Sequence, residues 1–431
     1  MHPTLVHTLV CPDRQDFWRC AQWSPDGSLI LARTESHRVH IWTSLVGTWS
    51  LLHTHQAPAP ILDTSWYALP ADIPSDKSTS AWCFAISCRD MPVRLVDAQF
   101  GQTKASYAIV NHVETYIAPQ VLTFTPDAMR LYGGLTAGLA MIPLACVGSN
   151  THSALSLSPH RSSRIEAGQH GIVSALAIGK APAVVERDLQ SDQLEVTAVA
   201  TFANAVGIYV TDPSWLAALE EQGSGWHSPL LGTSCALSGE SLCLCGWHIR
   251  EGQGVVQVAW HPAQRHILVV SVRRSTHLLV YDTSYLYGMN HPFQFQPLAT
   301  DDPALIARLE RDCTGSHQRL YFDMDSHGNF IAAGDQHGTV RLWQWSDVLA
   351  SKNPAMPVTP KSQWQAHTDA VGSVHFHPQR SRCLLTVGGA RHWPDLTDDQ
   401  GASPYGPYPL DNTCKVWDCE LYNEKMTSET N

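Results

Sequence analysis

The sequence predicts an all-β protein, a single seven-bladed β-propeller, from three observations. Helical periodicity is nearly absent, and short apolar or alternating runs recur along the 431 residues. Gly, Pro and Asp turns bound these runs, and a unit of three strands returns at intervals of roughly 40–60 residues. The hydrophobic fraction of 44% is sufficient for a large core, which 15 Trp residues can fill.

Four units show the repeated pattern clearly. In residues 17–42, an apolar strand ends at Trp23, a Ser-Pro-Asp-Gly turn follows, and two further strands end at Trp42. The same order of strand, polar turn, strand, short turn and strand returns three times, in residues 254–282, in residues 319–343, and in residues 370–389 completed by residues 413–418. Alternation with a period of two residues between such turns is typical of half-buried strands.

Weaker copies at residues 61–97, 120–143 and 172–211 bring the total to seven units, each with its fourth strand in the connecting segment. The predicted blades are residues 17–54, 61–107, 120–168, 172–247, 254–298, 319–365, and 370–418 together with 4–10, followed by a short flexible tail at 423–431. The apolar run at residues 5–10 is expected to complete the last blade, because closure removes an exposed sheet edge. Short helices are expected at residues 213–222 and 303–312, the second with Pro303 at its first position.

Composition excludes several classes of protein. The N-terminal ten residues lack the basic region and cleavage site of a signal peptide, and no run of about 18 apolar residues predicts a membrane span. The twelve Cys form no C-x-x-C pair, so Cys235, Cys243 and Cys245 are interpreted as packing residues rather than zinc ligands. We expect a reducing compartment, no metal and no cofactor. The net charge of −11 also excludes a polybasic protein that holds nucleic acid by bulk charge.

The sequence contains none of the common catalytic motifs, neither H-E-x-x-H, G-x-S-x-G, a P-loop nor G-x-G-x-x-G. Carboxylate pairs such as Asp301-Asp302 stand at predicted loops or helix ends, where capping explains them. We therefore expect a non-enzymatic binding protein without a small-molecule substrate. A hydrolase that uses the cup of the propeller remains a remote alternative.

The units are of the WD type, although most are degenerate. A WD blade uses a His before its first strand, an Asp in its second turn and a Trp as a buried polar network. The last unit keeps His367, Asp411 and Trp417 as this structural network. In three other units the turn Asp is replaced, by His337, Ser36 and Ser275 respectively.

Basic residues in the corresponding turns are candidates for RNA binding, because those turns open on one rim of a propeller. The candidates are Arg33, Arg89, Arg273, Arg274, Arg391 and His392, with His337 nearby. Ordinary solvated turn charge is the alternative. Trp393, Tyr405 and Tyr408 could stack on unpaired bases or pin the insert of the last unit. Arg319 opens an inner strand and is expected to have a structural ion pair or hydrogen bond.

Several segments resemble the telomerase Cajal body protein family of WD-repeat proteins, which includes a yeast relative linked to splicing. Residues 107–134 carry Asn111-His112 ahead of a strand, and residues 318–343 carry a Gln-Arg-aliphatic-Tyr-Phe-Asp run. Residues 374–395 contain a Gly-x-Arg-x-aromatic-Pro stretch that opens an acidic insert. The resemblance covers nearly the whole chain. The long N-terminal region of the family is expected to be missing, because the first blade begins near Phe17.

The resemblance implies a nuclear scaffold, in Cajal bodies or elsewhere in the nucleus, with the cytoplasm as the alternative location. Such a scaffold would bind small nuclear or telomerase-type RNA and support the biogenesis of ribonucleoproteins. The alternative is a scaffold for spliceosomal or other ribonucleoprotein proteins that does not contact RNA. Neither function involves a membrane.

Overall fold

A computed structural model of the chain describes residues 3–45, 48–67, 82–148, 152–157, 169–188, 193–212, 242–287, 304–351, 353–393 and 408–419. The expected helix at 213–222, Tyr405 and the expected tail at 423–431 lie outside these residues. The described strands form seven four-stranded sheets, which confirms the all-β, seven-bladed propeller predicted from the sequence. The chain divides into two compact units. Unit 1 comprises Met1–Gln56, Glu310–Ala350 and Val358–Asn431, and unit 2 comprises Ala57–Leu309 and Ser351–Pro357.

Unit 1 contains three antiparallel sheets. The first is formed by β2 (Trp18–Trp23), β3 (Leu29–Thr34), β4 (Arg38–Leu45) and β5 (Thr48–Gln56). The second is formed by β22 (Asp323–Met324), β23 (Phe330–Gly334), β24 (Thr339–Gln344) and β25 (Ser362–Gln365). The last blade is formed by β26 (Val371–His377), β27 (Arg380–Gly388), β28 (Thr413–Asp418) and the N-terminal β1 (Thr4–Val10).

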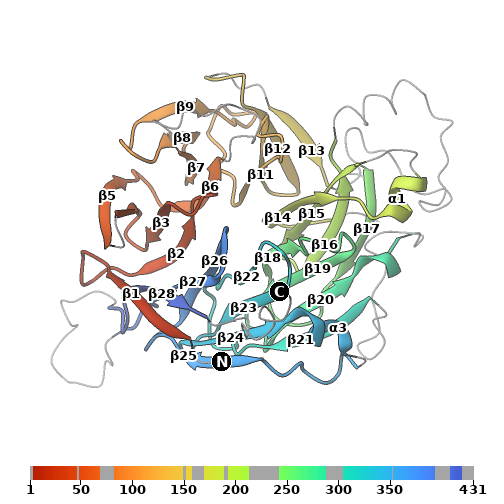
Figure 1. Ribbon diagram of the computed structural model, residues 1–431. Helices are drawn as coiled ribbons and strands as arrows, with labels where there is room; N and C mark the ends of the chain where they lie inside the picture. The colour runs from red at the N-terminus through yellow and green to blue at the C-terminus, as the bar shows by residue number, and fades with distance from the viewer. Residues whose placement is uncertain are drawn as a thin grey trace, which may run out of the picture. The chain divides into compact units, whose positions relative to one another are not determined.

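The N-terminal strand completes the last blade, as the sequence predicted (Figure 1). β1 pairs antiparallel with β28, with Leu9 opposite Cys414, and a bulge interrupts the register near its start. Leu9 is buried in a cluster with Trp18 and Trp23 of the first sheet and Val387 of the last. The strand therefore covers the edge of β28 and contributes one apolar side chain to the core of unit 1.

Unit 2 contains the other four sheets. Their first two are β6 (Ile61–Tyr67), β7 (Cys83–Cys88), β8 (Val93–Asp97) and β9 (Thr103–Tyr107), then β10 (Leu122–Phe124), β11 (Arg130–Gly134), β12 (Gly138–Pro143) and β13 (Ser153–Ser156). The other two are β14 (Val173–Lys180), β15 (Glu195–Thr201), β16 (Ala205–Val210) and β17 (Leu242–His248), then β18 (Val255–Trp260), β19 (Ile267–Val272), β20 (His277–Asp282) and β21 (Leu305–Glu310). All seven side chains of β15 are buried, as its central position in an apolar sheet requires.

The helix predicted at residues 303–312 is wrong, because this segment forms β21. Its apolar residues Leu305, Ala307 and Leu309 are buried while the residues between them are partly exposed. The apolar positions therefore follow the two-residue period of a strand. Pro303 resembles the first residue of a helix, but the segment after it pairs as a strand. The described helices are instead α1 (Ala183–Asp188) and α3 (Trp345–Ala350), with a 3-10 turn η1 (Thr283–Tyr285).

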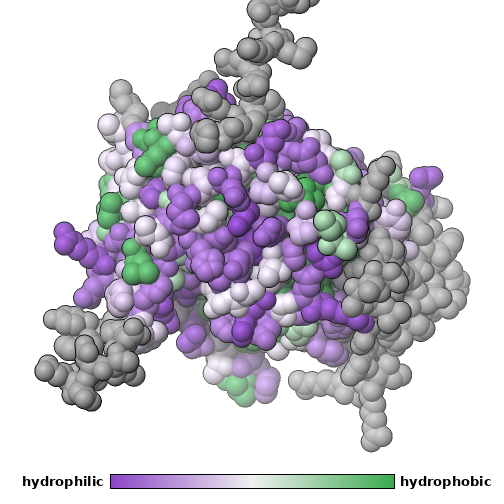
Figure 2. Space-filling model, turned by 90° about the horizontal axis from the view of Figure 1, so that it is seen from below, coloured by the Kyte–Doolittle hydropathy of each residue, from purple (hydrophilic) through white to green (hydrophobic). Residues whose placement is uncertain are grey.

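Exposed apolar side chains are scattered over the described surface. Figure 2 shows a face dominated by hydrophilic residues, on which the apolar ones form separate spots. Phe100, Met129 and Met356 are among the most exposed apolar residues. In the part of the chain that the structure describes, none of the helices has the length and apolar character needed to cross a bilayer.

Candidate arginine-lined binding site

The last blade contains a buried chain of side-chain hydrogen bonds. Trp417 donates its indole N–H to Thr386 Oγ1 at 2.9 Å. The hydroxyl of Thr386 is 2.8 Å from Nε2 of His367, and Nδ1 of His367 is 3.1 Å from Oδ2 of Asp411. A neutral imidazole satisfies all three bonds, accepting at Nε2 and donating at Nδ1. Burial lowers the pKa of His367 accordingly, and the hydrogen bond from His367 helps to hold the pKa of Asp411 below its usual range.

Three of the degenerate units replace this network with one of reversed polarity. In each, a carboxylate ahead of the first strand contacts a Ser or His in the second turn, so the acid and its partner have exchanged places relative to a WD blade. The pairs are Asp16 with Ser36, Glu251 with Ser275, and Asp312 with His337. Asp16 Oδ1 accepts from the Ser36 backbone N–H at 3.0 Å, and His337 Nε2 lies 3.2 Å from Asp312 Oδ2. Sequence reasoning missed these pairs, because it looked for the acid in the turn and not ahead of the first strand.

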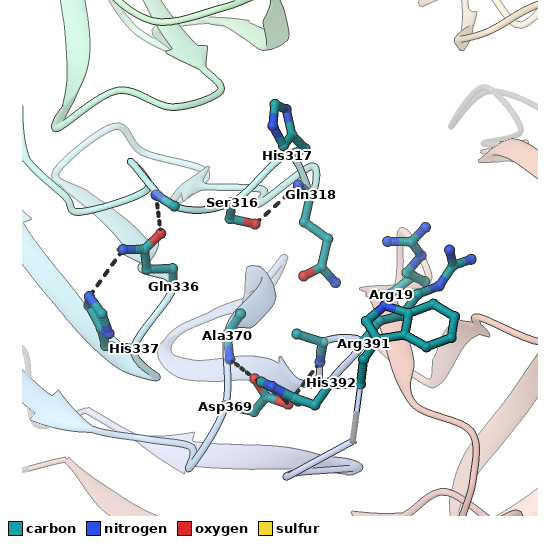
Figure 3. A pocket seen from close by; sticks show the side chains of 13 residues that line it. Arg19, Ser316, His317, Gln318, Gln336, His337, Asp369, Ala370, Arg391 and His392 are labelled. Carbon is teal, nitrogen blue, oxygen red and sulfur yellow. Dashed lines mark hydrogen bonds and ion pairs between the residues drawn. The ribbon is translucent and has the colours of Figure 1, made fainter. Parts of the chain in front are cut away.

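A pocket of about 800 Å³ opens in unit 1 beside the turn that carries His337 (Figure 3). Its walls are Arg19 of β2, residues 315–318 ahead of β22, residues 336–337 between β23 and β24, residues 369–370 ahead of β26, and residues 390–393 after β27. Neighbouring turns approach closely here. Gly338 has a φ of +86°, and a Cβ at this position would lie 2.1 Å from the carbonyl oxygen of His367, so the wall requires glycine.

Arg19 and Arg391 lie on the same side of the pocket and share one carboxylate. Arg19 Nε is 2.5 Å from Oε2 of Glu35, and a terminal nitrogen of Arg391 pairs with Oε1 of the same side chain. The arginine side chains are 40% and 53% exposed, whereas Glu35 is 17% exposed. The two guanidinium groups therefore reach solvent while their common counter-ion lies beneath them.

Two further arginines add positive charge around Arg19. Partial burial, followed by the charges of Arg391, Arg33 and Arg319, lowers the pKa of Arg19 to about 10. Arg33 donates a hydrogen bond from Nη2 to the hydroxyl of Tyr321 at 3.0 Å, and its guanidinium lies 5.7 Å from the centre of that ring. The result is a cluster of four arginines, Arg19, Arg33, Arg319 and Arg391, which we call the arginine cluster.

The three arginines of unit 1 that the sequence singled out, Arg33, Arg319 and Arg391, differ in exposure. Arg33 lies on β3 and is only 7% exposed, because its side chain packs on Tyr321. Arg319 is half-buried just ahead of β22. Arg391 is exposed and lines the pocket.

His392 anchors the loop that follows β27. Its Nε2 is 2.9 Å from Oδ1 of Asp369, and its backbone exchanges two 3.0 Å hydrogen bonds with Tyr408. Asp369 also accepts backbone N–H groups from Ala370 and Ala390 at 2.8 and 2.9 Å. His392 is thus engaged in the wall of the pocket, while Trp393 beside it is 66% exposed.

The remaining candidates lie in unit 2, each in a turn between two strands. Arg89 and Arg274 are exposed, and Arg274 has a φ of +54°. Arg273 donates from Nε to the carbonyl of Gln253 at 3.1 Å and stacks on Phe202, with its guanidinium 4.4 Å from the ring centre. Arg273 therefore has a structural role, because it packs the turn after β19 against the turn after β15 in the neighbouring sheet.

Sequence reasoning missed Arg19 and Glu35. Arg19 is a strand residue between the buried Trp18 and Cys20, whereas the candidate arginines were chosen from the turns. The signal that could have found it is a charged residue in an otherwise apolar inner strand, since such a charge requires a partner. Elsewhere among the described residues, no three His, Cys, Asp or Glu side chains are arranged to hold a metal ion.

The seven sheets and the Trp417 network define a WD-repeat β-propeller. No protein-family model matches the chain. The chain is a distant homologue of telomerase Cajal body protein 1, being 24% identical to the protein of that name from Mesocricetus auratus over 424 residues. That alignment covers 95% of this chain and 65% of the hamster protein.

The human protein of the same name is 24% identical over 400 residues, which cover 90% of this chain and 60% of the human one. The chain thus spans 60–65% of the length of these relatives. A Schizosaccharomyces pombe protein, guanine nucleotide-binding protein negative regulator 1, is 25% identical over 347 residues, or 78% of this chain and 72% of that protein.

Proposed function

We propose that the protein is a non-catalytic nuclear scaffold that binds small nuclear or telomerase-type RNA through the arginine cluster and supports ribonucleoprotein biogenesis. The names of its mammalian relatives associate them with telomerase and Cajal bodies. Since the chain spans less than two thirds of those proteins, their activities and partners enter here as part of the proposal.

The arginine cluster is the observation that carries the proposal. In a chain of net charge −11, long-range attraction to RNA is weak, so affinity must come from close contacts. Arg19 and Arg391 present two partly exposed guanidinium groups, which can bind phosphate oxygens in pairs or stack on bases. The exposed indole of Trp393 offers a stacking surface next to them in sequence.

The proposal is tested by fluorescence anisotropy with a labelled stem-loop RNA. The double change Arg19→Ala and Arg391→Ala should weaken binding by about tenfold to a hundredfold, corresponding to roughly 1–3 kcal/mol. Arg382→Ala is the matched control, because Arg382 lies near the opposite end of β27 and is 48% exposed. Equal losses in both proteins, or none in either, would contradict an RNA site at the cluster.

The turn arginines of unit 2 are proposed as additional RNA contacts. Arg274→Ala and Arg89→Ala test this directly, since both residues are exposed. Arg273→Ala would also remove the contact with Phe202, so its effect must be separated from a loss of stability. An unchanged affinity in the first two variants would restrict RNA binding to unit 1.

A protein-interaction scaffold that does not contact RNA, in splicing or another pathway, is the second candidate. The printed name of the S. pombe relative, a negative regulator of a guanine nucleotide-binding protein, favours protein partners. Ultraviolet crosslinking in nuclear extract separates the two functions. Crosslinks to RNA at Arg391 or Trp393 support the first candidate, and crosslinked RNA confined to co-purifying proteins supports the second.

A further inference from the structure

We propose that Glu35, which pairs with two arginines of the pocket wall, is a built-in counter-ion that competes with an incoming phosphate group for Arg19 and Arg391. The inference concerns the regulation of the site in the proposed function and rests on that function for its natural ligand. It identifies the chemistry recognised at the pocket as a phosphate group bridging two guanidinium groups.

The geometry of Glu35 resembles that of a bound anion. Its two carboxylate oxygens engage two different arginines, one from β2 and one from the loop after β27. The backbone N–H of Glu35 donates to the carbonyl of Phe17 at 3.0 Å, which fixes the turn that carries it. Because a carboxylate and a phosphate offer similar pairs of oxygens to guanidinium, both can bridge the same two groups.

The surroundings of the pair favour a further negative charge. Arg33 and Arg319 lie close enough to Arg19 to act on its charge, so further positive charge surrounds the arginine that Glu35 pairs with. Asp369, a carboxylate of the pocket wall, is already bonded to His392 and to three backbone N–H groups. An anion entering from solvent meets Arg19 and Arg391 first, because these side chains are more exposed than Glu35.

Single-stranded RNA fits this arrangement better than an acidic peptide does. A phosphodiester can bridge the two arginines while its base stacks on Trp393, which is 66% exposed and two residues after Arg391. A carboxylate peptide would use the charges but not the flat aromatic surface. RNA is therefore the ligand class that the pocket favours over an acidic peptide.

Glu35→Gln provides the test, with inorganic pyrophosphate as the probe in isothermal titration calorimetry at low salt. Removing the internal carboxylate should tighten pyrophosphate binding about tenfold, as expected when one like charge leaves a partly buried anion site. Asp347→Asn is the matched control: Asp347 is exposed on α3, at the end of β24 remote from the pocket, and its loss should leave the affinity unchanged. Adding Arg391→Ala to Glu35→Gln should abolish the gain.

Equal or weaker pyrophosphate binding by Glu35→Gln would overturn the proposal, since Glu35 would then hold the arginines in place rather than compete with the ligand. Glu35→Asp keeps the charge but retracts it by one methylene, so it should give an intermediate affinity even if the Gln variant folds poorly. Affinity of Glu35→Asp below that of the wild type would also count against competition.

The same proteins, titrated with a single-stranded 12-nucleotide RNA and with an oligoglutamate peptide, separate this inference from the proposed function. A gain for pyrophosphate without RNA binding in any variant would refute the RNA function while leaving the anion site in place. A larger gain for the peptide than for RNA of equal charge would overturn the choice of RNA as the ligand class.

Discussion

Thr386 links two buried side chains of the last blade, Trp417 and His367, through its hydroxyl. Its hydroxyl accepts from Trp417 and lies 2.8 Å from His367, and Thr386 itself is fully buried. Thr386→Val keeps the shape but leaves a buried N–H and a buried ring nitrogen unsatisfied. We expect a loss of about 1–3 kcal/mol in the free energy of unfolding, measured by urea denaturation.

Thr8→Val is the control for this prediction. The chemical change is the same, but Thr8 lies on β1, where it is exposed opposite Lys415. The free energy of unfolding should therefore change by no more than about 0.5 kcal/mol. If Thr386→Val were as stable as Thr8→Val, the hydrogen-bond chain would contribute little to the blade.

His40 should make stability depend on pH. The residue is 3% exposed, its ring packs edge-on against Trp18 at 5.1 Å, and Nδ1 is 3.0 Å from the hydroxyl of Thr54. Its Nε2 has no hydrogen-bond partner among the described residues. Burial is the main cause that lowers the pKa of His40 to about 4, with the charge of Arg38 adding to it and that of Asp16 opposing it.

The free energy of unfolding should fall as the pH falls, because the unfolded state binds more protons than the folded state. As the pH falls below about 6.5, the unfolded chain binds a proton at this His while the folded protein does not, until the pH approaches 4. The folded state should lose up to about 3 kcal/mol across that window. His40→Asn should remove this part of the slope in urea titrations between pH 7 and pH 4.5. Identical slopes for the two proteins would show that His40 titrates normally.

Single residues were predictable from the sequence only where a known pattern named them. His367, Asp411 and Trp417 were identified because they keep the positions of a WD blade, and the structure brings them together through Thr386. The ion pair of Arg391 with Glu35 joins residues more than 350 positions apart. No local pattern encodes such a contact, because it depends on the packing of the first sheet against the last.

At the scale of elements, β1 is the strand whose packing is most easily tested. Leu9 is 7% exposed within an apolar cluster, whereas the next residue, Val10, is 53% exposed. Leu9→Asp places an unpaired charge in the core and should lower the melting temperature by several degrees, measured by differential scanning fluorimetry, because more than about 1 kcal/mol is lost.

Val10→Asp makes the same change on the solvent side of the same strand, so it should leave the melting temperature nearly unaltered. A comparable loss in both variants would mean that the charge acts on the pairing of β1 with β28 rather than on the core. No loss in either would mean that β1 contributes little to the stability of the last blade.

Most strands were predictable because each alternates between buried and exposed positions or is apolar throughout. Residues 303–312 show the limit of this approach. The same apolar residues satisfy a helical and a two-residue period over so short a segment, and pairing with β20 decided the outcome. The six-residue helices α1 and α3 were missed, since a segment of that length gives no clear periodicity.

For the whole molecule, a net charge of −11 restricts how RNA can be held. If Arg19 and Arg391 supply the main contacts, about two phosphates are neutralised, and log K should fall with log salt with a slope near about −1.5 for a single strand. Anisotropy titrations between 50 and 300 mM salt, at about 25 °C, measure this slope. The Arg19→Ala, Arg391→Ala protein should give a slope shallower by about 1.4, the contribution of two phosphates, and a wild-type slope steeper than about −4 would require a far more extensive basic surface.

The whole fold was more predictable than the site within it. Seven repetitions of one strand pattern reinforce one another, so an error such as the one at residues 303–312 does not alter the fold class. The pocket, in contrast, is not built from a repeated pattern. It combines Arg19, Asp369, Arg391 and the turns beside them, whose proximity follows from the fold and from no repeated feature of the sequence.

The pairing of β1 with β28 has a consequence for synthesis on the ribosome. Leu9 and Cys414 lie about 400 residues apart in the chain, so at about 5–20 residues per second the first strand waits between about 20 and 80 seconds for its partner. Contacts of such separation form late in folding because the entropy of loop closure must first be overcome. Weakening the strand at Leu9 should therefore accelerate unfolding while leaving the folding rate almost unchanged. The pairing of β1 with β28 thus controls the lifetime of the folded state.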